Sequence, residues 1–169
     1  EGYDCEKIAI EKIKHFVSKE AFNIDGLGKK IVENFWNLGL IKLPQNIFNL
    51  DYNKVEKLEG WGKLSATNLK FSIEQKKKIS LERFIYSLGI RHIGQENAKI
   101  IAHQLKSSVN FLKLTENINI DNLSNIDGIG PTQIQSIKNF FLNTNNLNVL
   151  FELNKNLLIT NIIPINDDG

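Results

Sequence analysis

Glycine pairs recur four times along this chain, and their spacing points most directly to chemistry. In each case an apolar residue stands before the closing glycine, and a helical pattern follows it. The closing glycines are at positions 28, 62, 94 and 130, which are 34, 32 and 36 residues apart. Such near-constant spacing indicates a repeated structural unit. The four segments are 24–28, 58–62, 88–94 and 126–130, and the third has a longer stretch between its glycines.

A helix that begins at each closing glycine would direct its free N–H groups and positive dipole end at the turn. This arrangement binds anions, and phosphate is the anion it suits best. Lys29 and Lys63 directly follow their turns, and Arg91 lies inside the third. A phosphate clamp made of backbone amides reads no base, so it predicts DNA binding without sequence preference. The fourth turn, with Asp127 and Pro131 instead of a lysine, is the one most easily explained by structure alone.

The alternative is that the glycines only allow adjacent helices to pack closely. Four turns in register, three of them with cations, favour phosphate binding over packing alone.

The elements that hold these turns are predicted to be helices. Apolar residues recur at helical spacing after each closing glycine, over 29–38, from 63 to about 77, and over 95–105 and 131–142. An apolar run at 157–163 is compatible with one strand or with a connector. We therefore predict an all-α fold of about ten to twelve helices.

Composition sets outer limits on these hypotheses. The chain has 169 residues and 19.3 kDa, of which 41% are hydrophobic and 24% charged. These values fit one ordinary domain or two small ones, and exclude a disordered chain. A membrane protein is not predicted, because no apolar run reaches the roughly 18 residues of a span. The single cysteine, Cys5, cannot form an internal disulfide, and a net charge of +2 does not by itself indicate nucleic acid. A sequence that opens with Glu1 and contains no methionine is expected to be part of a longer protein.

The turns and their flanks resemble helix-hairpin-helix motifs. Four stretches carry the resemblance: 15–28, 58–69, 83–94 and 126–131. Over about residues 5–155 the sequence is similar to the helix-hairpin-helix domain of bacterial NAD-dependent DNA ligases. The resemblance implies a compact DNA-binding domain of four tandem motifs over 16–155, with hairpins near 22–38, 55–77, 84–105 and 123–142. Residues 1–15 would be the end of a zinc-finger segment with a linking helix, and 156–169 a connector toward a BRCT domain.

The resemblance also implies a reaction for the parent protein. Such ligases seal nicks between a 3′-hydroxyl and a 5′-phosphate in replication and repair, using NAD, magnesium and a structural zinc. Their AMP-accepting lysine lies in a Lys-x-Asp-Gly motif, which does not occur here; Asn23 and Asn125 stand where that lysine would precede Asp-Gly. We therefore expect no catalytic residue in this chain and no ligase activity from it alone.

The role implied for this chain is to grip the minor groove of nicked duplex DNA as a monomer in the bacterial cytoplasm, at the nucleoid. Adenylation, oligonucleotide-binding and zinc-finger domains would precede it. Cys5 would be the last of four zinc ligands. The implied phosphate contacts are Gly26, Gly28, Lys29, Gly60, Gly62, Lys63, Arg91, Gly94, Gly128 and Gly130.

Two other functions compete with this hypothesis. One is a stand-alone helix-hairpin-helix scaffold of DNA repair or recombination. The other is a helix-hairpin-helix glycosylase, which needs a catalytic aspartate some 20 residues after a hairpin within a base pocket. The aspartate that follows Asp127 is Asp167, which is too distant, and this argues against a glycosylase.

Overall fold

The computed structural model of the chain describes residues 2–162, with side chains from residue 5 onward. Within these limits the fold is mostly helical, which confirms the predicted class in its main feature. The elements are α1 (Gly2–Val17), α2 (Lys29–Asn37), η1 (a 3-10 helix, Pro44–Asn49), α3 (Tyr52–Val55), α4 (Lys63–Gln75), β1 (Lys78–Ser80), α5 (Leu81–Ser87), α6 (Gln95–Leu105), α7 (Ser108–Leu112), η2 (3-10, Lys113–Thr115), α8 (Asn117–Asp121), η3 (3-10, Asn122–Asn125), α9 (Pro131–Leu142), α10 (Thr144–Asn156) and β2 (Leu158–Thr160).

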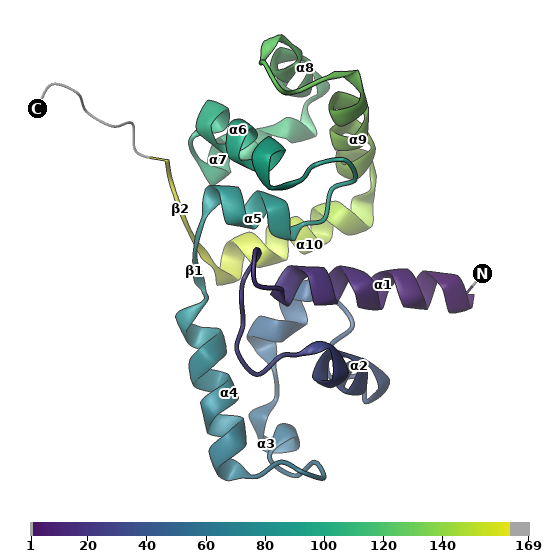
Figure 1. Cartoon of the computed structure of the whole chain (residues 1–169), viewed down its shortest axis with the longest axis vertical. Helices are drawn as coiled ribbons and strands as arrows, with labels where there is room; N and C mark the ends of the chain where they lie inside the picture. Colours follow the sequence, from purple (N-terminus) through teal and green to yellow (C-terminus); the bar gives the residue numbers. More distant parts are fainter. Residues whose placement is uncertain (1, 163–169) are drawn as a thin grey trace, which may run out of the picture.

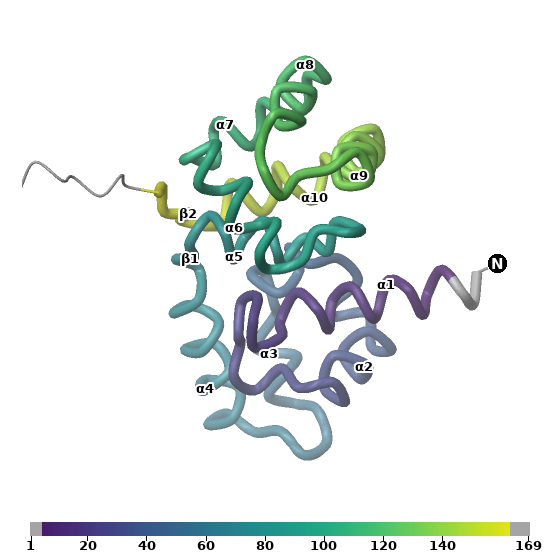
Figure 2. Tube along the Cα trace, turned by 45° about the horizontal axis from the view of Figure 1, so that its top comes forward, coloured from purple at the N-terminus to yellow at the C-terminus, as the bar shows by residue number. Residues whose placement is uncertain are grey.

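The helices form two groups on either side of a central layer. Helices α2, α3 and α4 lie on one side, and α6, α7, α8 and α9 on the other, with α1, α5 and α10 between them (Figures 1 and 2). Helix α1 packs on both α2 and α5, while α10 packs on both α9 and η1. The first two glycine turns therefore belong to one group and the last two to the other.

A small parallel sheet, which the all-α prediction missed, connects the two groups. Strand β1 follows α4 and pairs with β2 near the end of the described chain, in the register Ile79 to Ile159. Both isoleucines are buried, and the sheet lies beside α5 and α10 (Figure 1). Helix α4 ends at Gln75, slightly before the predicted end at about residue 77. The apolar run that begins at residue 157, for which a strand or a connector was expected, contains strand β2.

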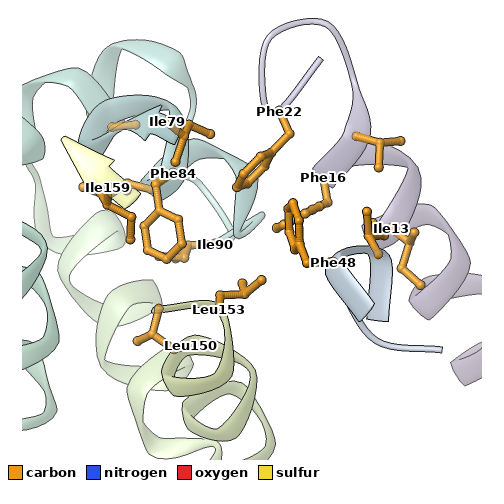
Figure 3. Close-up of a cluster of buried hydrophobic side chains, with 14 of the residues drawn as sticks. Ile13, Phe16, Phe22, Phe48, Ile79, Phe84, Ile90, Leu150, Leu153 and Ile159 are labelled. Carbon is orange, nitrogen blue, oxygen red and sulfur yellow. The ribbon is translucent and has the colours of Figure 1, made fainter. Parts of the chain in front are cut away.

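One continuous hydrophobic core runs through both groups. On the first side Ile13, Phe16 and Phe48 meet Phe22, whose ring centroid lies 4.3 Å from that of Phe16. On the other side the core is built from the β strands, α5 and α10 (Figure 3). Its labelled members there are Ile79, Phe84, Ile90, Leu150, Leu153 and Ile159. Because the core is shared, the two groups fix each other's position.

Arg83 on α5 anchors the loop that leads into the first glycine turn. Its guanidinium Nη1 donates to the carbonyl oxygens of Lys19 at 3.1 Å and of Ala21 at 2.7 Å. The first helix of this hairpin is α1, which ends at Val17, and the loop that Arg83 holds lies between α1 and the turn.

No helix within the described part of the chain is both long enough and apolar enough to cross a membrane.

Candidate nucleic-acid interface

The four turns share one backbone hydrogen bond. In each, the N–H of the apolar residue before the closing glycine donates to the carbonyl oxygen three residues earlier, at 3.0 to 3.3 Å. The donors lie on the inner side of the turn, and three of them are buried, while Trp61 is half-buried. The pairs are Leu27 with Ile24, Trp61 with Leu58, Ile93 with Ile90, and Ile129 with Ile126. The four turns are therefore copies of one structure.

The residue two positions before each closing glycine adopts a left-handed backbone. Its φ is +92° at Gly26, +83° at Gly60 and +94° at Gly128. In the third turn this position is His92, with φ +66°. The third turn is thus the same length as the others, and the expectation of a longer turn was wrong. Gly89, taken for its first glycine, instead follows the end of α5 with φ +65°.

The closing glycines are different, because nothing in the fold requires glycine at three of them. Gly28, Gly62 and Gly94 have φ of −71°, −153° and −86°, which other residues adopt readily. A β-carbon added at any of the three would meet no atom within 4 Å. At Gly130 it would lie 3.1 Å from Oε1 of the flexible Gln133 side chain. Their side-chain-free surface is therefore directed outward and open to a ligand.

The helices that follow the turns also begin differently from four other helices of the fold. Helices α3, α5, α7 and α10 start on a side chain that accepts hydrogen bonds from first-turn N–H groups. These capping residues are Asp51, Ser80, Ser107 and Asn143. Helices α2, α4, α6 and α9 start on the closing glycines, which supply no capping side chain. Their first-turn donors are left to an external anion.

Cations stand at three of the four turns. Lys29, Lys63 and Arg91 are exposed, and within residues 2–162 none of them forms an ion pair. A free cation beside unpaired helix N–H groups strengthens attraction for phosphate. The fourth turn has Asp127 and Pro131 in place of a cation, so its attraction depends on the backbone alone.

The turns associate in two pairs through their left-handed glycines. A β-carbon at Gly26 in the first turn would lie 3.3 Å from Cδ1 of Leu69, on the helix that follows the second turn. A β-carbon at Gly128 in the fourth turn would lie 2.7 Å from Cδ1 of Ile100, on the helix that follows the third turn. Each pair therefore places two potential phosphate sites next to each other.

Residues beside the third turn extend this surface in a way that the sequence did not indicate. An open groove of about 720 Å³ runs between α1 and the turn, from Lys7 and Lys12 to Gly94. His15 forms part of its lining, and its Nε2 lies 2.7 Å from the carbonyl oxygen of Tyr86. His92 also lines the groove and is exposed. Lys7 and Lys12 lie in α1, and α2, α3 and α4 all stand between them and the third turn in the sequence, so no local pattern could have linked them to that turn.

Neither Trp61 nor Cys5 has surroundings that indicate a ligand site within the described residues. Trp61 packs in the core, with its ring centroid 5.6 Å from that of Phe35. Cys5 is an exposed thiol on α1. In the described part of the chain, no three His, Cys, Asp or Glu side chains gather as a metal site would require.

Comparison with known proteins agrees with the geometry. Residues 83–150 match the family described as "Helix-hairpin-helix motif". Over all 169 residues the chain is 73% identical to the DNA ligase of Pelagibacter ubique. It is 41% identical to the DNA ligases of Wolbachia pipientis, over the whole chain, and of Rickettsia bellii, over 94% of it. The chain spans about a quarter of the length of these relatives, 25%, 26% and 25% respectively. By both its sequence and its turns, the chain belongs with the helix-hairpin-helix region of bacterial DNA ligases.

Proposed function

We propose that this chain binds duplex DNA without sequence preference, by clamping backbone phosphates with its four glycine turns. The observation that carries the proposal is the backbone conformation and exposure of Gly28, Gly62 and Gly94. They have ordinary φ values and open space around the β-carbon position, so the fold itself gives no reason for glycine there. Close approach of an external group does give one. The unpaired cations beside these glycines make that group an anion.

The recognition mode follows from the donors. Backbone N–H groups and helix N-termini contact phosphate rather than base edges, so they hold DNA in place without reading its sequence. Two pairs of turns, one in each helix group, suit a duplex whose two strands are both held. We propose that these four tandem motifs lie along the minor groove of nicked DNA.

The parent protein is proposed to be a DNA ligase, since the relatives named above are DNA ligases. Its proposed dependence on NAD comes from the resemblance of the four motif stretches to NAD-dependent ligases. In this proposal NAD and magnesium serve an adenylation domain elsewhere in the parent protein, because the Lys-x-Asp-Gly motif is not in this chain. The present residues position the nicked duplex, and a BRCT domain follows them. The proposed location is the bacterial cytoplasm, on DNA.

This chain would contribute one ligand, Cys5, to a zinc site of the parent protein. Structural zinc takes four ligands, and the described residues offer one thiolate, Cys5, with no partner cluster. Its exposed thiol on α1 is placed where a preceding segment can reach it, and in the proposal Cys5 completes a site whose other three ligands that segment supplies.

The first test is the salt dependence of duplex binding. If about four to seven phosphates are engaged, log K against log salt should slope near −4 to −6, at roughly −0.9 per phosphate. Fluorescence anisotropy on two duplexes of unrelated sequence measures both slope and preference. A flat salt response, or discrimination above about tenfold between the duplexes, contradicts the phosphate clamp.

The cations beside the turns give a second test. Lys29→Ala and Lys63→Ala should each weaken DNA binding and flatten the salt slope by about one unit, because each removes one phosphate contact. Stability should change little, since an exposed, unpaired lysine contributes little to folding. Lys78→Ala is the matched control, because Lys78 is exposed and lies in β1, beyond the opposite end of α4 from Lys63. If the control weakens binding more than the turn variants do, the DNA face is on another side of the molecule.

A further inference from the structure

Asn97 hydrogen-bonds two different turns at once, which no other side chain within the described residues does. Its Oδ1 accepts from the N–H of Gly94 at 3.2 Å, in the third turn. Its Nδ2 donates to the carbonyl oxygen of Gly128 at 3.1 Å, in the fourth turn. A single planar amide, with donor and acceptor in fixed relation, therefore joins the two turns.

The first pair of turns has no such bridge. Ser65 holds the place relative to Gly62 that Asn97 holds relative to Gly94, three residues later. Its hydroxyl accepts from the Gly62 N–H at 2.9 Å and donates to the Gly62 carbonyl oxygen at 3.2 Å, so it serves its own turn. Among the described residues, no side-chain hydrogen bond joins the first and second turns, which meet through the contact of Gly26 with Leu69.

We propose that Asn97 is a positioning residue that fixes the spacing and orientation of the third and fourth turns, so that they bind two phosphates as one unit. This inference rests on the proposed DNA binding. The fourth turn has no cation of its own, so its contact depends on being held in place by its neighbour. A site fixed before binding avoids the entropic cost of ordering two loops on the DNA. The third and fourth turns thus form a preset unit, and the first and second an adjustable one.

Asn97→Ser separates the hydrogen bond to Gly94 from the hydrogen bond to Gly128. A serine can keep the acceptor for the Gly94 N–H, as Ser65 does for Gly62, but it is too short to reach Gly128. Asn119→Ser is the matched control. Asn119 is half-buried like Asn97, and its Nδ2 donates to the carbonyl oxygen of Lys113 at 2.7 Å, away from the turns.

Binding to a duplex and thermal unfolding are measured on the 169-residue chain. Asn97→Ser should weaken DNA binding about three- to tenfold, as loss of one hydrogen bond allows, and flatten the salt slope by up to about one unit. Asn119→Ser should do neither. Both variants should keep a cooperative thermal transition with similar losses in Tm.

Double variants show whether the effect is one of positioning. Combined with Lys29→Ala, in the other helix group, Asn97→Ser should be additive to within about twofold. Combined with Arg91→Ala, which weakens the third turn itself, its effect should be clearly smaller than additive. If the third turn no longer binds its phosphate, the alignment of the fourth turn with the third no longer contributes to affinity. Loss of Asn97 then has little further effect.

The possible results separate the inference from the proposed function. If the unmodified chain does not bind DNA with a steep salt slope, the proposed function fails. If it does bind, and Asn97→Ser is indistinguishable from Asn119→Ser or is additive with Arg91→Ala, only the positioning role is overturned. Loss of the cooperative transition in Asn97→Ser alone also overturns it, because Asn97 would then be a residue of the fold.

Discussion

Gly28→Val combined with Gly62→Val is expected to lower DNA affinity by roughly a hundredfold or more, while the chain still unfolds cooperatively. Each valine places its side chain over the first-turn N–H groups that the phosphate must reach. Loss of a hydrogen bond to a charged group is worth about 1.5–3 kcal/mol, so two turns lose about 3–6 kcal/mol. The fold should tolerate both changes, because φ is negative and no atom lies within 4 Å of either β-carbon position. Anisotropy titrations and urea unfolding measure the two effects.

Valine is a poorer helix N-cap residue than glycine. The loss of folding stability that this causes needs its own control. Ser107→Val removes the cap of α7, whose Oγ accepts from the Asn110 N–H at 3.2 Å. That change should cost about 1 kcal/mol of folding stability and leave DNA affinity unaltered. If Gly28→Val and Gly62→Val lose no more affinity than Ser107→Val does, these glycines do not face the DNA.

Gly128→Val should be the most destabilising of the glycine changes, lowering the free energy of unfolding by about 2–5 kcal/mol. Two effects add. A left-handed backbone costs a residue with a β-carbon about 1–2 kcal/mol, and more when that carbon is branched. Overpacking a filled site costs about 1–3 kcal/mol. The added carbon would lie only 2.7 Å from Cδ1 of Ile100, so either the Ile100 side chain or the fourth turn must shift. Urea unfolding followed by circular dichroism measures the loss.

Gly94→Val is the comparison that isolates these causes. It lies in the adjoining turn, but its φ is −86° and its β-carbon position is open. We expect it to lower stability by no more than about 1 kcal/mol, the size of a cap effect, while weakening DNA binding. Equal destabilisation by Gly94→Val and Gly128→Val would mean that the two kinds of glycine do not have separate roles.

Helix starts were predictable because the signal is local. A glycine followed by apolar residues at helical spacing placed the beginnings of α2, α4, α6 and α9 directly after the closing glycines. The spacing of apolar residues was less informative about which face of a helix is buried. Leu64 belongs to the apolar pattern that predicted this helix, yet it is 75% exposed, while Ala66 and Leu69 are buried. It precedes Ala66 by two residues, which is about 200° around a helix and therefore the opposite side.

The roles of individual site residues depended on geometry that a sequence does not contain. The glycine pattern does not show which glycine of a pair has a left-handed backbone; in the first, second and fourth turns only the first of the two has it. In the third turn the left-handed position belongs to His92, and a glycine pattern could not find it. Asn97 contacts a carbonyl group 31 residues away, at Gly128. Pairing of the turns by Leu69 and Ile100 likewise depends on how the groups pack.

The β1–β2 pair sets an order on the way this chain reaches its folded state. Its strands are 80 residues apart, so the sheet closes a long loop, which is slower than forming any single hairpin. During translation, at roughly 5–20 residues per second, β1 is synthesised about 4–16 s before its partner. During that interval Ile79 has no strand partner, because Ile159 has not yet been synthesised. Both pairs of turns can form earlier, but the two helix groups are joined by this sheet only after residue 160 has left the ribosome.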